Sequence, residues 1–214
     1  MHHDTDTLMA AIHRGRVRIG PRTEAIALLL HGGRAIDEQP NRLRDVSYLR
    51  MLPFANAIRL TGGRRVAPVL VHNSHGGWVA SSGSGVVQAR AVVRALHDEF
   101  DLPVVLVGHS SGGWAALRAG VEDVAIGSVA LAPWVADDES TERLRDKKIR
   151  VIHGLADTVC SPILAREFVE RLQADGGDAS FFGVPGGGHA MLDKPWRWHL
   201  RAARAVHEIV KPRG

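Results

Sequence analysis

Continuous apolar runs alternate with helix-type stretches along most of this 214-residue chain, and this alternation constrains its fold more than any other feature. The runs are Ala25–Leu30, Val66–Val71, Leu102–Val107, Ile126–Leu131, Ile149–Ile152 and Ala179–Val184. Strands that are apolar throughout belong to sheets covered on both faces, as in parallel sheets with helical crossovers. We therefore predict an α/β fold with a mainly parallel sheet of about six strands, flanked by helices.

The stretches between these runs have the residue spacing of helices. The expected helices are Val46–Leu60, Val86–Phe100, Trp114–Ala119, Pro162–Leu172 and Trp196–Val210. In the first of them, three-residue steps predict an apolar face, although Pro53 perturbs the pattern; its members are Leu49, Leu52, Ala55 and Ile58. Ser161 and Pro162 are typical N-cap and first-position residues of a helix.

Length and composition indicate one soluble domain that spans residues 1–214, within which residues 1–22 stay unassigned. Apolar residues make up 45% of the chain and charged residues 23%, as in ordinary globular proteins. No apolar run approaches the roughly 20 residues that span a bilayer, so we expect no stable membrane insertion. The N-terminus, with Asp4 and Asp6, lacks the positive region of a secretory signal. We expect a cytoplasmic protein that is a monomer or a homodimer.

Cysteine content and charge narrow the function classes further. Cys160 is the single cysteine, which excludes an intrachain disulfide and fits a reducing compartment. The net charge is +4, but the arginines are scattered, which is typical of a solvated surface. No recognition motif accompanies the charge, so nucleic acid is not an expected partner. The histidines form no convincing metal cluster, and the glycine runs lack dinucleotide-binding spacing, so we expect no metal and no cofactor.

The strand predicted at Leu102–Val107 leads directly into Gly108-His109-Ser110-Ser111-Gly112. A serine hydroxyl is a poor nucleophile until a structure presents and activates it. A tight strand-to-helix turn presents the hydroxyl, and flanking glycines permit the close approach of helix and sheet. This pattern predicts that Ser110 is a catalytic nucleophile.

Two further strand ends supply the partners that such a serine needs. Asp157 follows the fifth predicted strand, and His189 follows the sixth after three glycines. The carboxyl ends of parallel strands meet at one edge of a sheet, where ligands bind. We expect His189 to act as general base and Asp157 to orient it. Asp137 and Asp138, after the fourth strand, are the alternative acids.

The chain resembles the α/β-hydrolase superfamily over residues 25–210. The resemblance rests on the order Ser110, Asp157, His189 and on His31-Gly32-Gly33 after the first strand. More narrowly, the chain is similar to small, lidless bacterial hydrolases of the dienelactone-hydrolase-like group. It departs from true dienelactone hydrolases, which use a cysteine nucleophile where this chain has Ser110. The resemblance implies a minimal three-layer fold. Only about 15 residues separate the fourth and fifth predicted strands, so we expect no cap domain and an open site.

A Ser-His-Asp triad with an acyl-enzyme intermediate predicts a carboxylic ester hydrolase, acting on small or accessible acyl esters. The oxyanion donors are expected to be the backbone N–H groups of Ser111 and of Gly33, with Arg34 as the alternative to Gly33. Trp78 and Trp134 are expected either on the pocket wall or in ordinary packing. Arg34 is expected to meet an anionic substrate group or to form a surface ion pair.

The triad alone does not identify the leaving group. The alternative functions are therefore thioesterase, peptidase or acyltransferase, and, from another class, a ligand-binding protein without turnover.

Overall fold

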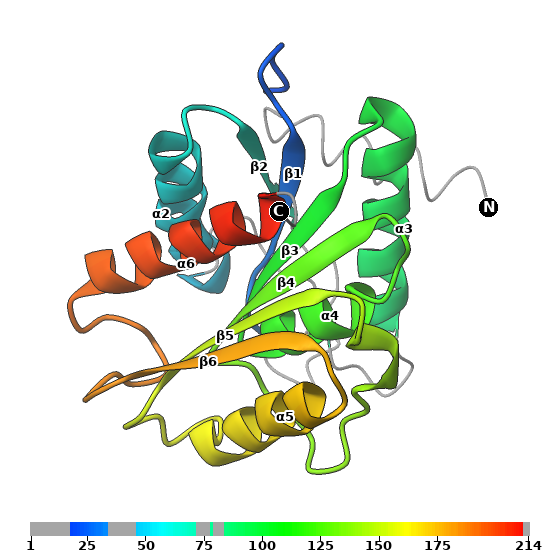
Figure 1. Cartoon of the computed structure of the whole chain (residues 1–214). Helices are drawn as coiled ribbons and strands as arrows, with labels where there is room; N and C mark the ends of the chain where they lie inside the picture. The colour runs from blue at the N-terminus through cyan, green and yellow to red at the C-terminus, as the bar shows by residue number, and fades with distance from the viewer. Residues whose placement is uncertain (1–17, 34–45, 72–77, 79–83, 212–214) are drawn as a thin grey trace.

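One parallel sheet organises the chain in this computed structural model, which describes residues 18–33, 46–71, 78 and 84–211 (Figure 1). The strands are β1 (Ala25–Leu30), β2 (Val66–Val71), β3 (Val104–His109), β4 (Ala125–Leu131), β5 (Lys148–Gly154) and β6 (Asp178–Val184). They are all parallel, in the order β2-β1-β3-β4-β5-β6. The predicted sheet of six parallel strands is confirmed, with strand ends that differ by one or a few residues.

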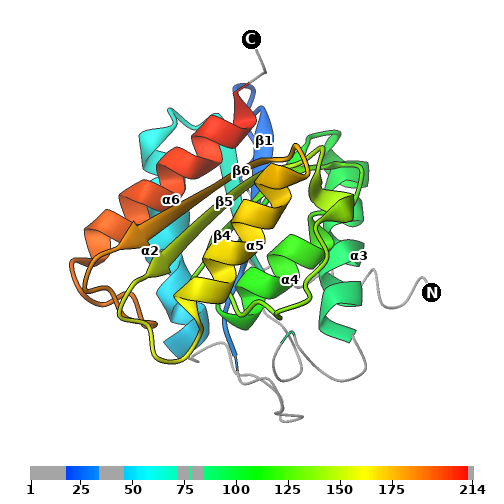
Figure 2. The same cartoon turned by 60° about the horizontal axis from the view of Figure 1, so that its bottom comes forward.

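Helices cover both faces of this sheet and make a three-layer structure (Figures 1 and 2). They are α2 (Val46–Thr61), α3 (Ser84–Phe100), α4 (Ser111–Ala119), α5 (Pro162–Ala174) and α6 (Pro195–Val210). Helices α2 and α6 pack together on one face, and α3, α4 and α5 lie on the other. The hydroxyl of Ser161 accepts a hydrogen bond from the Leu164 N–H at 3.3 Å, which confirms the predicted cap of α5.

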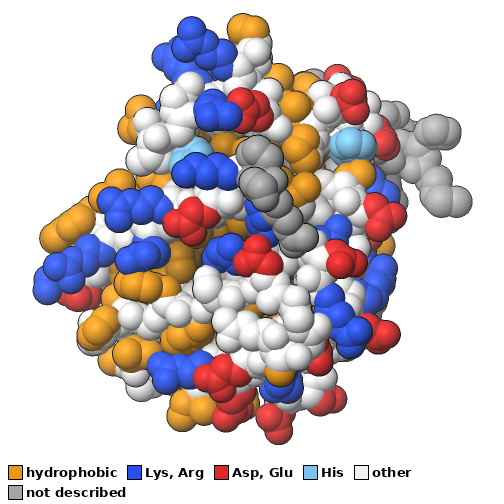
Figure 3. Space-filling view, viewed as in Figure 1, with side chains coloured by type: hydrophobic (Ala, Val, Ile, Leu, Met, Phe, Trp, Pro, Cys, Tyr) orange, Lys and Arg blue, Asp and Glu red, His pale blue; other side chains and the backbone are white. Residues whose placement is uncertain are grey.

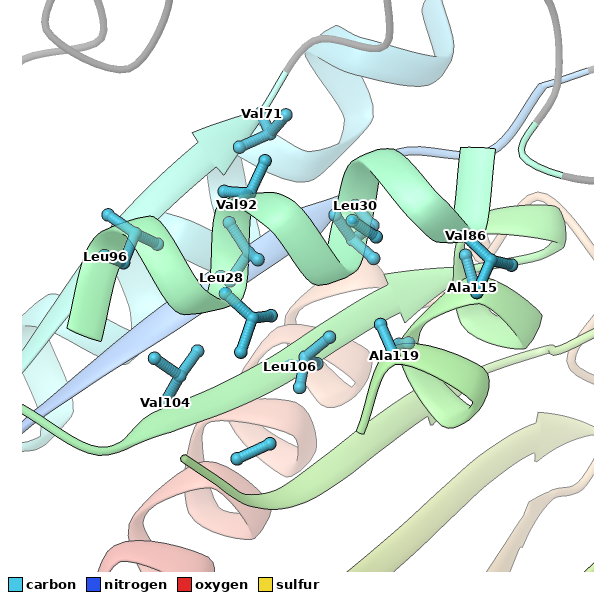
Figure 4. Close-up of a cluster of buried hydrophobic side chains, with 14 of the residues drawn as sticks. Leu28, Leu30, Val71, Val86, Val92, Leu96, Val104, Leu106, Ala115 and Ala119 are labelled. Carbon is cyan, nitrogen blue, oxygen red and sulfur yellow. The ribbon is translucent and has the colours of Figure 1, made fainter. Parts of the chain in front are cut away.

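The core consists of apolar side chains that point alternately, along each central strand, toward the two helix layers. Figure 4 shows the cluster beneath α3 and α4, in which Leu28 and Leu106 point from the sheet toward the helices. Both side chains are fully buried. Burial of such a side chain stabilises the fold by about 1.5–3 kcal/mol. On α3, the side chains of Val86, Ala89, Val93 and Leu96 are buried in this cluster.

The expected face of α2 is partly wrong. Leu49 and Leu52 are 45% and 42% exposed, whereas Met51, Phe54 and Ile58 are buried against the sheet and α6. Three-residue steps drift away from the 3.6-residue turn, so a run at that spacing cannot stay on one face. The helix continues through Pro53, which lies on its exposed side.

The connection from β4 to β5 holds a single 3₁₀ turn, Glu142–Leu144, in place of a cap helix. The connection is fixed to α4 by the buried carboxylate of Glu139. This carboxylate accepts hydrogen bonds from Trp114 Nε1 at 2.9 Å and from Arg118 Nε at 2.7 Å. On the face shown in Figure 3, basic side chains lie among acidic and apolar ones, as expected for scattered arginines. Among the described helices, none has the length and apolar content that crossing a membrane requires.

Candidate active site

Ser110 lies on a sharp turn between β3 and α4. Its backbone has φ 56° and ψ −122°, a conformation that residues with a side chain rarely adopt. The backbone N–H of Ser110 donates to the Leu131 carbonyl oxygen of β4 at 3.0 Å. The backbone carbonyl oxygen of Ser110 accepts from the Gly113 N–H at 2.9 Å. The turn is therefore held from the strand side and from the helix side. It presents the Ser110 hydroxyl at the carboxyl edge of the sheet.

The glycines on either side of Ser110 are required by close backbone approaches. A Cβ atom at Gly108 would collide with the carbonyl group of Gly112 across the turn. A Cβ atom at Gly112 would collide with the carbonyl oxygens of Leu30 and His31 at the end of β1. These approaches bring α4 directly over the ends of β1 and β3, which is the role that the motif predicted for its glycines.

His189 lies in the loop after β6, and its side chain contacts Ser110. Its Nε2 atom lies 3.0 Å from Ser110 Oγ, and its Nδ1 atom lies 2.9 Å from Asp157 Oδ2. Because Asp157 can only accept when ionised, Nδ1 carries the ring hydrogen and Nε2 keeps its lone pair. This tautomer can take a proton from Ser110. The side chain of His189 is 17% exposed.

Asp157 is a buried carboxylate with four hydrogen-bond donors around it. Oδ1 accepts from the backbone N–H groups of Val159 at 2.8 Å and Cys160 at 3.0 Å. Oδ2 faces the imidazole nitrogens of His189 and of His153, the latter at 3.2 Å. Burial raises the pKa of Asp157, but the bonds from Cys160, His189 and Val159 outweigh it and lower the pKa below its ordinary value. The site therefore keeps Asp157 ionised.

The alternative acids lie outside this series of hydrogen bonds, and the single thiol lies beside Ser110. Asp137 and Asp138 are exposed, whereas Asp157 is the carboxylate that meets His189. The Cys160 thiol is buried and in hydrogen-bonding contact with the Ser110 side chain. Burial, together with the nearby Asp157 charge, raises its pKa to about 11, so the thiol stays neutral.

Solved structures with the same architecture show what fold this is. The chain is similar to XC6422 from Xanthomonas campestris, described as an α/β serine hydrolase without lid, with 17% identity, TM-score 0.67, and 91% and 88% of the two chains covered. It is also similar to Est1E from Butyrivibrio proteoclasticus, with 11% identity, TM-score 0.62, and 89% and 90% covered. This chain has the α/β-hydrolase fold.

SOBER1 from Arabidopsis thaliana shares this fold at 15% identity and TM-score 0.62, with 88% of this chain and 100% of SOBER1 covered. No family model and no curated protein matches the chain. The α/β-hydrolase fold explains why three residues far apart in the sequence meet, since each follows a strand that ends at the same edge of the sheet. The fold by itself does not define the reaction.

The loop after β1 borders the candidate nucleophile. A Cβ atom at Gly32 would lie 3.3 Å from the Ser110 Cβ. The Ser111 hydroxyl donates to the Gly33 carbonyl oxygen at 3.2 Å, which ties this loop to the first turn of α4. Ser111 opens that helix, and its N–H therefore has no acceptor within the helix. Arg34, the alternative donor and an expected substrate contact, lies outside the described residues.

The two candidate tryptophans have different environments. Trp78 is fully buried in the core, and its Nε1 donates to the His31 carbonyl oxygen at 2.7 Å. It therefore packs inside the protein and does not form a pocket wall. Trp134 is 41% exposed, its ring meets Trp114 edge-on, and its N–H donates to the Ser110 carbonyl oxygen at 3.3 Å. Trp134 thus borders the candidate site.

Histidines supply the site features that the sequence analysis did not identify. His153 contacts Asp157 four residues further along the chain, and the His-Gly-x-x-Asp spacing at the end of a strand was the available signal. The described residues contain no group of three or more His, Cys, Asp or Glu side chains placed to hold a metal ion. The openness of the site stays a prediction, because residues 34–45 and 72–77, which follow β1 and β2, lie outside the described residues.

Proposed function

We propose that this protein is a serine hydrolase that cleaves carboxylic esters through an acyl-enzyme intermediate. The observation that carries the proposal is the hydrogen-bonded series Ser110 Oγ, His189 and Asp157, at 3.0 and 2.9 Å. An activated serine needs a base within hydrogen-bond reach and a third group that orients the base. The esterases and serine hydrolases that share the fold support the same assignment.

In the first half of the reaction, Ser110 Oγ attacks the ester carbonyl carbon as His189 Nε2 takes the hydroxyl proton. His189 then returns this proton to the leaving alcohol, and Ser110 is left as an acyl ester. Asp157 holds the imidazole in the required tautomer and stabilises the imidazolium while it exists. In the second half, His189 takes a proton from water, whose oxygen attacks the acyl carbon. His189 then gives this proton to Ser110 Oγ as the acyl–oxygen bond breaks, which releases the acid and free Ser110.

The tetrahedral oxyanion of each half-reaction is bound by backbone N–H groups. We assign one donor to Ser111, at the start of α4, and the other to Gly33, in the loop tied to Ser111. The N-terminal end of α4 adds its positive dipole at the same place. Loss of one such donor costs about 3 kcal/mol of transition-state stabilisation in comparable sites.

The substrate class follows from the connection between β4 and β5, which contributes no covering helix. We expect small or accessible acyl groups, held beside the exposed ring of Trp134. Longer acyl chains would leave apolar surface in water and gain little binding energy per added methylene.

The test is a hydrolysis panel in which one acyl group is presented as an ester, a thioester, an anilide and an ester with an added alcohol acceptor. The proposal expects turnover of short p-nitrophenyl esters by the wild type and none above background by Ser110→Ala. Faster turnover of the thioester, the anilide or the alcohol acceptor would replace the ester hydrolase with a thioesterase, peptidase or acyltransferase. No turnover of any donor would contradict an enzymatic function.

A further inference from the structure

Asp157 meets two imidazole rings on one oxygen atom. His189 Nδ1 lies 2.9 Å from Asp157 Oδ2, and His153 Nε2 lies 3.2 Å from the same atom. The side chains of His153 and Asp157 are both fully buried. A triad needs only one histidine, so the second ring has no function in the mechanism above. Its contact with the carboxylate requires an explanation of its own.

The hydrogen-bond partners of His153 define which nitrogen carries its proton. Nε2 also lies 3.2 Å from the Cys160 carbonyl oxygen, and both of its partners are acceptors. Nε2 must therefore carry the hydrogen. Nδ1 is buried with no hydrogen-bond partner among the described residues, and we take it as the bare nitrogen of a neutral ring. Burial also lowers the pKa of this imidazole, against the opposing effect of the Asp157 charge.

We propose that His153 is a positioning residue that donates its Nε2–H to Asp157 and thereby limits how strongly Asp157 binds His189. This proposal rests on the proposed function and deepens it. A carboxylate oxygen that receives two N–H donors divides its charge between them. The His153 donor therefore leaves less negative charge to stabilise a protonated His189. The proton that His189 takes from Ser110 is then released more easily to the leaving group.

Other titratable groups that face the site do not supply this effect. The pKa of His109, at the end of β3, is lowered to about 3 by burial first and by the His189 and Arg50 charges next, so its ring stays neutral. Cys160, before α5, is a neutral thiol with a pKa of about 11. Arg50 on α2 keeps its positive charge throughout. The side chains of these groups stay in constant charge states near neutral pH, and none of the three donates to Asp157 as the His153 ring does.

A purely structural role for His153 is the competing explanation, because its ring stacks on Phe181 at 6.5 Å between centroids. The variant His153→Phe keeps an aromatic ring and removes the donor. The variant His153→Gln removes the ring and places an amide N–H near the position of Nε2. His153→Leu lacks both the ring and the donor, and it completes the comparison if the larger ring in His153→Phe disturbs the core.

The experiment is an NMR titration of the His189 Cε1–H resonance in the folded wild type and in these variants. We expect the midpoint to move to higher pH by roughly half a unit to one unit in His153→Phe and His153→Leu. His153→Gln should stay near the wild type. As a matched control, His97→Phe removes a histidine whose Nδ1 meets the Leu102 carbonyl oxygen before β3, and it should leave the midpoint unchanged.

A His189 midpoint in His153→Phe and His153→Leu equal to that of the wild type would overturn the proposal. A shift in His153→Gln as large as in His153→Phe would also overturn it, because the ring and not the donor would then matter. The acid limb of kcat/KM for ester hydrolysis should follow the NMR midpoint. If the midpoint moves but no variant or wild type hydrolyses any acyl donor, the proposed function fails while the link between His153 and Asp157 stands.

Discussion

The imidazole Nε2 atom of His109 lies 3.0 Å from the main-chain oxygen of His189, 80 residues further along the chain. The carbonyl oxygen can only accept, so His109 donates its Nε2–H. The rings of the two histidines are 5.0 Å apart between centroids. The residue before the candidate nucleophile thus fixes the loop that carries the candidate base. This contact joins the end of β3 to the loop after β6 through the main chain of His189 and not through its side chain.

The burial of His109 predicts a pH-dependent stability. Burial first, and the positive charges of His189 and Arg50 next, lower its pKa from 6.5 to about 3. Between these values the unfolded chain binds a proton that the folded protein does not, so stability falls as the pH decreases. His109 alone contributes up to roughly 1.4 kcal/mol per pH unit in this window. Urea unfolding of the wild type at pH 7 and pH 5 measures the total change.

His109→Gln isolates the contribution of this residue, since it keeps an N–H donor near the position of Nε2 and cannot titrate. The free energy of unfolding of this variant should fall less between pH 7 and pH 5 than that of the wild type. The same slope in both proteins would show that His109 titrates normally in the folded state.

The backbone of Ser110 predicts an unusual order of stability among its variants. At φ 56° and ψ −122°, a Cβ atom is strained, and glycine is not. Ser110→Gly should therefore be more stable than Ser110→Ala by about 1 kcal/mol, after the greater entropy of unfolded glycine is subtracted. Chemical denaturation of the two variants measures the difference. A Ser110→Ala protein that is as stable as Ser110→Gly would contradict the strained turn.

The close approach of α4 to β1 predicts different tolerance at two glycines near the site. In Gly112→Ala the new Cβ collides with the carbonyl oxygens of Leu30 and His31, so the helix must move away from the sheet. We expect a loss of about 2 kcal/mol or more in stability, together with a large loss of activity. Gly188→Ala is the control, because no atom lies within 4 Å of its added Cβ. Equal thermal stability of the two variants would refute the steric explanation.

The exposed ring of Trp134 predicts an effect on substrate binding. Trp134→Ala should raise KM for short p-nitrophenyl esters several-fold and change kcat little, because the ring contributes apolar contact and no group to the chemistry. Leu60→Ala, which truncates a 77% exposed side chain at the end of α2, is the control and should leave both constants unchanged. A fall in kcat with KM unchanged would exclude Trp134 from the binding surface.

Most of the sheet was predictable, because a strand covered on both faces has to be apolar throughout. The start of α4 was not, since Gly112 and Gly113 are poor helix formers and are present for their contacts with β1 and Pro133. The buried face of α2 was also misjudged, because exposed Leu49 and Leu52 resemble core residues in sequence.

At the site, strand ends and residue order predicted that Ser110, Asp157 and His189 would meet. The direction of a side chain after a strand end is not encoded in that pattern, so the core position of Trp78 was not predictable. The partner of His109 was not predictable either, because its hydrogen bond runs from the end of β3 to the loop after β6. The contact between His153 and Asp157 is local, four residues along the chain, and its one sequence signal was the His-Gly-x-x-Asp spacing.

The most direct test of the catalytic account is intact-mass spectrometry after exposure of the folded protein to a fluorophosphonate. We expect one phosphonyl adduct, mapped to Ser110 by peptide sequencing. The adduct should be absent in Ser110→Ala and should form at least a hundred-fold more slowly in His189→Ala, because the base contributes about 10²–10⁴-fold. No adduct on the folded wild type, or an adduct that forms equally fast without His189, would contradict an activated serine at this site.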